Sequence, residues 1–203
     1  MRTLVLIGHP NPDSYCHALA HHYAQAARQG GAEVHILDLA RLNFDPSLHR
    51  GYRSIQPLEP DLQRAQELLT WCQHLLVVTP TWWSSMPAVL KGFIDRIFLP
   101  GFAFKYRPGH LIPEKLLRGR TARLIVTTDS PPLLLRTVMG DSTVRAIAQG
   151  VLGFSGFKVK STRFGILRTS TPRQREAWLA QTARLAQRDH AHARARPPAF
   201  TPS

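Results

Sequence analysis

One stretch of the sequence, residues 79–96, limits most strongly what this chain can fold into. It begins at the end of an apolar run, residues 75–78, which predicts a buried strand. It ends in a predicted helix, whose apolar residues recur at helical spacing: Val89, Leu90, Phe93, Ile94 and Ile97. Trp82 and Trp83 lie between the two elements. Because ligands of parallel α/β sheets bind beyond the carboxyl ends of strands, this loop predicts a site for a flat ligand, unless both tryptophans are ordinary core residues.

The remaining sequence alternates between strand and helix patterns. Strands are predicted at 3–8, 33–39, 121–128 and 157–164, and helices over the residues up to 29 and at 61–73, 141–152 and 172–188. A turn-rich segment, residues 43–60, interrupts the alternation as a long excursion. This order predicts an α/β fold with a parallel sheet and right-handed crossovers. We expect one domain over residues 1–190, followed by a flexible, basic Ala/Arg/Pro tail over 191–203.

The composition narrows the class of protein and of ligand. The chain has 203 residues, of which 43% are hydrophobic, enough for one buried core. No apolar run approaches the roughly 20 residues of a membrane span, and the N-terminus lacks a signal-peptide pattern, so we expect a cytoplasmic protein. Cys16 and Cys72 form no metal or disulfide pattern, so no metal site is predicted. The formal net charge of +13 indicates affinity for anions, but basic residues are not interleaved with aromatic residues, which disfavours nucleic acid.

The loop after the first strand has the features of a phosphate site. It opens a helix, and the free amides at a helix start attract anions. His9, Ser14 and the amides of Tyr15 and Cys16 are the candidate donors. The loop lacks the glycine patterns of dinucleotide and P-loop sites, so the alternative is a capped turn with a surface histidine.

Two further loops carry candidate ligand contacts. Residues 98–106 contain Phe98, Phe102, Phe104 and Tyr106. Such an aromatic loop predicts a ligand lid or an interface, and the alternative is a small hydrophobic cluster within the domain. The predicted fourth strand ends in a polar loop, Thr127-Thr128-Asp129-Ser130, which would share one edge of the sheet with the other loops.

Taken together, these loops resemble those of the flavodoxin-like NAD(P)H:quinone oxidoreductase family, which includes the ancillary oxidoreductases of bacterial potassium-efflux systems. The resemblance runs from residue 3 to about residue 178. Its first signature is His9-Pro10-x-x-x-Ser14. Its middle signature is Pro80-x-x-Trp83-x-x-x-Pro87-Ala88-x-Leu90-Lys91-Gly92-x-x-Asp95-Arg96. Its remaining matches are Gly101-Phe102-Ala103-Phe104-x-Tyr106, Thr127-Thr128 and Gly156-Phe157.

The resemblance implies a five-stranded sheet in order 2-1-3-4-5 with a flavin, FMN or FAD with FMN favoured, between strands 1 and 3. It implies ping-pong transfer of two electrons from NAD(P)H to a quinone or similar flat acceptor. It also implies a homodimer, with Trp83, Phe104 and Tyr106 contacting the acceptor. The cofactor-binding residues that it implies are His9, Ser14, Tyr15, Cys16, Pro80, Thr81, Trp82, Trp83, Ser84, Thr127, Thr128, Asp129 and Ser130.

The chain also departs from the family pattern. The animal quinone reductases have a glycine-rich fourth-strand loop, followed by a tyrosine and a histidine that aid flavin reduction. Here the loop continues as Pro131-Pro132, and Met139 stands at the histidine position. We therefore assign no catalytic side chain. Two readings compete with the enzyme: a flavin-binding regulatory subunit that docks on a membrane transporter, and a basic nucleic-acid-associated protein without cofactor.

Overall fold

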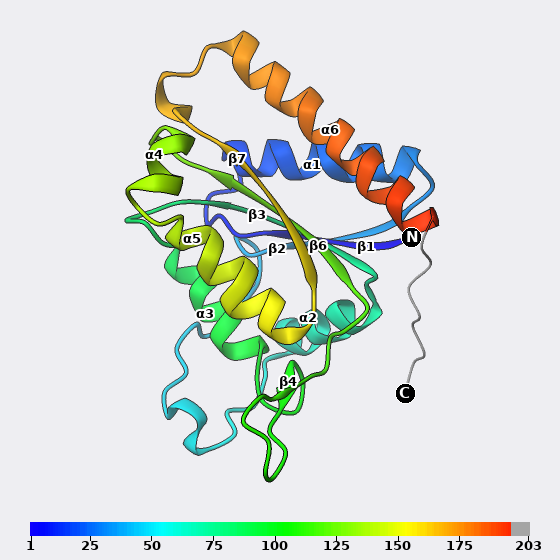
Figure 1. Cartoon of the computed structure of the whole chain (residues 1–203), viewed down its shortest axis with the longest axis vertical. Coiled ribbons are helices and arrows are strands. Elements are labelled where there is room, and N and C mark those ends of the chain that lie inside the picture. The colour runs from blue at the N-terminus through cyan, green and yellow to red at the C-terminus, as the bar shows by residue number, and fades with distance from the viewer. Residues whose placement is uncertain (196–203) are drawn as a thin grey trace.

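The computed structural model describes residues 1–195, with side chains to residue 191. Five parallel strands form the central sheet in the order β2-β1-β3-β6-β7 (Figure 1). Their bounds are β1 Arg2–Ile7, β2 Glu33–Asp38, β3 His74–Pro80, β6 Thr121–Thr127 and β7 Lys158–Phe164. Strand β3 is buried along its whole length, as its apolar sequence predicts. The observed order confirms the predicted 2-1-3-4-5 sheet.

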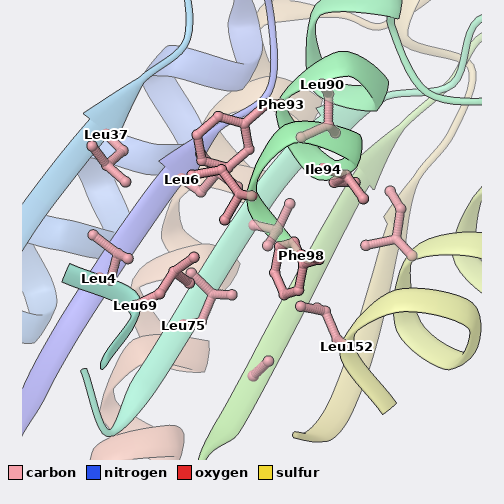
Figure 2. Close-up of a cluster of buried hydrophobic side chains, with 14 of the residues drawn as sticks. Leu4, Leu6, Leu37, Leu69, Leu75, Leu90, Phe93, Ile94, Phe98 and Leu152 are labelled. Carbon is pink, nitrogen blue, oxygen red and sulfur yellow. The ribbon is translucent and has the colours of Figure 1, made fainter. Parts of the chain in front are cut away.

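Helices cover both faces of the sheet (Figure 1). One face carries α1 (Tyr15–Gln29) and α6 (Pro172–Ala195), and their core includes Leu19, Tyr23 and Ala186. The other carries α2 (Pro60–Trp71), α3 (Ala88–Ile97), and α5 (Ser142–Val144) with its π-helical continuation η2 (Arg145–Gly153). Figure 2 shows this second core, where Phe93 of α3 lies over Leu6 of the sheet.

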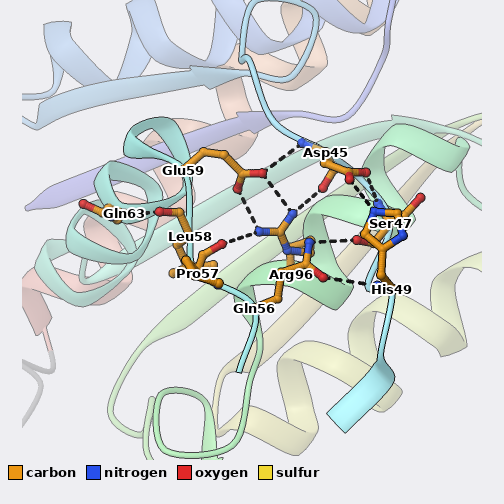
Figure 3. Close-up of polar contacts among 9 residues, drawn as sticks. All are labelled: Asp45, Ser47, His49, Gln56, Pro57, Leu58, Glu59, Gln63 and Arg96. Atoms are coloured by element: carbon orange, nitrogen blue, oxygen red, sulfur yellow. Dashed lines mark hydrogen bonds and ion pairs between the residues drawn. The ribbon is translucent and has the colours of Figure 1, made fainter. Parts of the chain in front are cut away.

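The long excursion between β2 and α2 is held against α3 by one buried arginine (Figure 3). The Arg96 side chain is 0% exposed. Its Nη1 donates to the Asp45 carbonyl at 2.5 Å, and its Nη2 donates to the Pro57 carbonyl at 2.8 Å and to Glu59 Oε2 at 2.8 Å. The guanidinium therefore ties both ends of the excursion to one helix, and the short 3-10 turn η1 (Gly51–Arg53) lies between them.

Some elements differ from the sequence-based expectation. The aromatic loop contains β4 (Phe104–Lys105), which pairs with β5 (Glu114–Lys115) in an antiparallel ribbon. A short helix, α4 (Pro132–Thr137), follows the polar loop where we predicted continued loop, because proline is tolerated in the first turn of a helix.

The C-terminal helix also differs in length from the prediction. Helix α6 extends to Ala195, so the predicted tail at 191–203 begins inside this helix, and residues 196–203 lie outside the described part. Within residues 1–195, no helix combines the length and apolarity needed to cross a membrane.

Candidate functional site

A cavity lies at the carboxyl ends of β1, β3 and β6, where loops from three parts of the chain meet. It encloses about 130 Å³ and is open to solvent on one side. Its lining residues are His9, Ser14, Tyr15, Cys16, Pro80, Thr81, Trp82, Thr127, Thr128, Asp129 and Leu167. The chain passes from β1 outward to β2 and then back past β1 to β3, so the direction of the connections reverses between β1 and β3. This reversal makes the position the switch point, where open α/β sheets bind ligands.

The first loop brings a set of hydrogen-bond donors to this cavity. Ser14 occupies the N-cap position of α1, but its side chain makes no capping bond. Its Oγ instead lies 2.8 Å from His17 Nδ1. The first amides of the helix, at Tyr15 and Cys16, have no intrahelical acceptor and are available to an anion. The predicted donors thus converge, and the Ser14 hydroxyl pairs with His17 instead of capping the helix.

His9 also lines this cavity, and we call His9, Ser14 and the amides of Tyr15 and Cys16 the cradle. Its Nδ1 accepts a hydrogen bond from the Asn11 amide at 3.0 Å, and its ring meets Trp82 edge-on at 5.4 Å between centroids. Burial lowers the pKa of His9, and the nearby His17 lowers it further. A neutral His9 with Nδ1 occupied presents its Nε2–H as a donor.

The tryptophan loop is a tight two-residue hairpin. Trp82 and Ser85 exchange two backbone hydrogen bonds at 2.8 Å, and the residues between them, Trp83 and Ser84, have φ of +50° and +56°. Positive φ is uncommon for a bulky residue and is typical of strained functional turns. Trp83 is fully exposed, at 101%, whereas Trp82 faces the cavity. The Ser142 hydroxyl donates to the Ser84 carbonyl, so the start of α5 braces the turn.

The third loop closes the cavity from the β6 side. Thr127 Oγ1 lies 3.4 Å from Cys16 Sγ, which joins this loop to α1. Burial raises the pKa of the Cys16 thiol to about 11, so the thiol stays protonated at neutral pH. Asp129 Oδ1 accepts from the Arg168 amide at 2.7 Å, which engages one carboxylate oxygen in a contact with the following loop.

The structure places the predicted site residues in two groups. Ten of the predicted cofactor residues line the cavity, whereas Trp83, Ser84 and Ser130 do not. Phe104 and Tyr106 line a second cavity of about 600 Å³ between α3, the aromatic loop and η2. That cavity is mostly apolar and includes the Lys91–Asp95 ion pair.

Sequence reasoning missed three residues beside the first cavity. Leu167 lines it from the 3-10 turn η3 (Leu167–Thr169). The Tyr15 hydroxyl donates to the Arg175 carbonyl at 2.6 Å, and the Arg175 guanidinium lies over the Tyr15 ring at 5.8 Å. Asp38 contacts His17 Nε2 at 2.9 Å behind the cradle. No local sequence pattern signals these pairs, because their members belong to different elements of the fold.

An apolar rim of exposed side chains lies on the segments that follow β6 and β7. Its members are Leu133, Leu134, Val138, Met139 and Ile166. The Gly165 backbone lies close to the Pro132 ring, and the Leu167 amide donates to the Thr128 carbonyl at 3.1 Å, so the two segments are packed together. Together with Trp83, this rim adds exposed apolar side chains to the loops at the carboxyl end of the sheet.

A protein family and several curated proteins are similar to this chain over most of its length. The profile of a protein family described as having a flavodoxin-like fold matches residues 1–188. An uncharacterised NAD(P)H oxidoreductase of Haemophilus influenzae is 26% identical over 193 residues, which cover 92% of this chain and 95% of that protein. NAD(P)H dehydrogenase (quinone) 1 of Cavia porcellus is 26% identical over 183 residues, which cover 78% of this chain and 66% of that protein. This chain therefore matches only about two thirds of the animal enzyme.

Solved structures share the same architecture. The Smu.1420 protein of Streptococcus mutans superposes with a TM-score of 0.80 at 28% identity, covering 93% of this chain and all (100%) of that chain. The FMN-dependent NADH-azoreductase of Bacillus anthracis, solved in complex with FMN, shares the fold at 16% identity with a TM-score of 0.72. That likeness covers 94% of this chain and 100% of the azoreductase.

Proposed function

We propose, from the premise that this chain belongs to the flavodoxin-like fold family, that it is a flavin-dependent NAD(P)H oxidoreductase acting on a quinone or similar flat acceptor. The observation that carries the proposal is the convergence of three loops on one cavity at the switch point of the sheet. The names of the relatives in Haemophilus influenzae and Cavia porcellus support the same class of activity.

The chemistry of the cavity suits a flavin nucleotide. Hydroxyl groups, amides and a histidine N–H supply donors for a phosphate and for the polar edge of a ring system, and Trp82 supplies an aromatic wall. Its volume of about 130 Å³ is below that of a typical ligand pocket, roughly 300 Å³ or more, so a nucleotide extends from it toward the open side. FMN is favoured over FAD because FMN is bound by a protein of the same fold.

We assign the ligand contacts by loop. His9, Ser14 and the amides of Tyr15 and Cys16 hold the phosphate. The remaining cofactor contacts come from the other two loops: Pro80, Thr81, Trp82, Trp83, Ser84, Thr127, Thr128, Asp129 and Ser130. A flavin held by these residues would supply the hydride chemistry for a ping-pong transfer of two electrons from NAD(P)H to the acceptor. The protein binds, orients and desolvates the reactants.

The acceptor side of the site differs from that of the animal enzymes. Met139 stands where the resemblance places a histidine. Because its side chain has no titratable group, it cannot transfer a proton to or from the ligand. Trp83 and the apolar rim favour a flat, weakly polar acceptor.

We extend the proposal to a homodimer in which Phe104 and Tyr106 reach the acceptor site of the partner. The apolar 600 Å³ cavity that they line, bounded by α3 and η2, would lie at that interface. A cytoplasmic location and a membrane-protein partner stay predictions from the sequence.

The test is the visible absorption spectrum of protein purified without added cofactor, followed by anaerobic addition of NADPH. The expected result is a yellow protein that bleaches and recovers when a soluble quinone is added. Chromatography of the released flavin separates FMN from FAD. A colourless protein that neither retains added flavin nor oxidises NADPH contradicts the proposal. Flavin binding with very slow turnover, together with capture of a membrane protein, supports the regulatory alternative instead.

A further inference from the structure

Behind the phosphate cradle lies a hydrogen-bonded chain of three side chains from two elements. Ser14 Oγ is 2.8 Å from His17 Nδ1, and His17 Nε2 is 2.9 Å from Asp38 Oδ1. The His17 side chain is only 7% exposed, so the two contacts satisfy both ring nitrogens within the protein. Ser14 lines the cavity, whereas His17 and Asp38 do not.

The contact with Asp38 fixes the state of one ring nitrogen. A carboxylate only accepts hydrogen bonds, so Nε2 carries a hydrogen whether or not the ring is charged. The proton that His17 gains or loses is therefore the one at Nδ1, between the ring and Ser14. In the neutral ring Nδ1 is an acceptor, and the Ser14 hydroxyl hydrogen points at it. In the charged ring Nδ1 donates to Ser14 Oγ, and the hydroxyl hydrogen is free to turn elsewhere.

We propose that His17 is a proton-coupled positioning residue that switches the Ser14 hydroxyl from bonding the ring to donating to the flavin phosphate. This inference rests on the proposed function. The phosphate favours the charged ring twice: it accepts the released Ser14 hydrogen, and its negative charge attracts the nearby imidazolium. Binding of the phosphate therefore takes up a proton, and the affinity for FMN falls as the pH rises.

Several other titratable or charged groups lie around His17. Asp38 stabilises the charged ring, and Arg41, whose Nε lies 3.2 Å from Asp38 Oδ2, opposes it. His9 faces His17 at 6.5 Å between ring centroids; its Nδ1 accepts from the Asn11 amide, and burial lowers its pKa, which favours the neutral ring. Asp13 and His21, on the same helix or just before it, are exposed to solvent.

The experiment compares FMN with riboflavin, which lacks the phosphate, by fluorescence titration of the flavin-free protein between pH values of about 6.5 and 8.5. For the natural sequence we expect the dissociation constant of FMN to rise about tenfold across this range, and that of riboflavin to stay constant. The sign is informative, because the second ionisation of the phosphate, near a pKa of about 6, would by itself strengthen FMN binding as the pH rises.

The variant His17→Asn keeps a neutral polar group beside Ser14 and removes the imidazole ring that takes up the proton. We expect its FMN affinity to change less than about threefold over the same pH range, and its calorimetric proton uptake on FMN binding to approach zero. His21→Asn, an exposed histidine on the same helix, is the matched control and should follow the natural sequence. A flat FMN profile in the natural sequence, or a full pH dependence in His17→Asn, overturns the inference while the proposed function stands. A folded protein that binds neither flavin overturns both.

Discussion

The two ends of the sheet each bury a histidine against an aspartate, and they use the pair differently. At the carboxyl end, His17 and Asp38 stand behind Ser14, which faces an open cavity. At the amino end, the Tyr23 hydroxyl lies 2.9 Å from both His74 Nε2 and Asp189 Oδ2. No residue of that second group lines either cavity found in the described chain.

The difference lies in what completes the hydrogen bonding. At the amino end every partner is protein: Arg123 forms a two-point ion pair with Asp189, and Thr121 Oγ1 lies 2.7 Å from His74 Nδ1. This closed network attaches α6 to the sheet. At the carboxyl end the chain of contacts stops at a hydroxyl group that faces solvent, so it retains the capacity to bind a ligand. The same residue types therefore serve attachment at one end and, we infer, recognition at the other.

The largest expected effect comes from breaking the closed network with Asp189→Asn. Removal of one charge leaves the Arg123 guanidinium buried without its counter-ion, which typically costs about 3 kcal/mol or more. Urea denaturation should therefore show a free energy of unfolding lower by about 3 kcal/mol, whereas the FMN affinity of the folded protein should stay within about twofold.

The matched control for that change is Glu176→Gln, which alters an exposed carboxylate on the same helix. Its free energy of unfolding should stay within about 0.5 kcal/mol of the natural value. If Asp189→Asn weakened FMN binding as strongly as changes at the carboxyl end do, the proposed division between the two ends would be wrong.

The next effect is a dependence of stability on pH that arises from His74. Burial lowers the pKa of His74 from 6.5 to about 4, so the folded state resists a proton that the unfolded chain accepts. Between these two values the unfolded state binds more protons, and stability falls as the pH is lowered from about 6.5 toward 4, by up to roughly 3 kcal/mol. Urea denaturation of the natural sequence and of His74→Asn measures this slope.

In His74→Asn the slope between pH values of about 6.5 and 5 should largely disappear, even if the variant is less stable at every pH. His21→Asn, which removes an exposed histidine, should keep the natural slope. An unchanged slope in His74→Asn would mean that another group takes up the proton.

A smaller effect is expected from Asp38→Asn at the carboxyl end, and it should change FMN affinity more than stability. Loss of this charge makes a proton on His17 less favourable, so FMN affinity near neutral pH should fall about five- to tenfold. The free energy of unfolding should change by less than about 1 kcal/mol, because Asp38 lies at the rim of the sheet rather than in a closed network. Fluorescence titration and urea denaturation of one preparation measure both quantities.

The control for Asp38→Asn is Glu33→Gln, which alters a carboxylate at the other end of the same strand, β2. It should leave FMN affinity unchanged. Equal losses of affinity in the two variants would indicate a general effect of charge on phosphate binding and not a role for the contact with His17.

The sequence predicts one part of this picture well and the other hardly at all. Apolar runs such as residues 75–78 locate the strands, and the family resemblance implies the strand order, so the switch-point cavity is predictable. Two contacts are not predictable from the sequence: His17 with Asp38, and Arg123 with Asp189. In each pair the two residues lie on different elements. Helix α4 was missed for a local reason: two adjacent prolines indicate a loop, although the second can begin a helix.

The smallest expected effect comes from backbone strain, which also differs between the two ends of the sheet. Among residues 1–195, the non-glycine residues with positive φ are Trp83, Ser84, Asp141 and Ile166, and all follow the carboxyl ends of strands or lie beside α5. Trp83 makes little contact, so its φ of +50° is not repaid by packing. Asparagine tolerates this conformation better, and Trp83→Asn should raise the free energy of unfolding by about 0.5 kcal/mol.

The matched control is Leu111→Asn, which replaces an equally exposed apolar side chain at a residue without positive φ. It should bring no rise in the free energy of unfolding, because it relieves no positive φ. If Trp83 is kept in this strained turn for its contact with the acceptor, Trp83→Asn should also raise the KM for a soluble quinone. A variant that gains no stability relative to Leu111→Asn would show that the turn is not strained, and the proposed contrast in strain between the ends of the sheet would then fail.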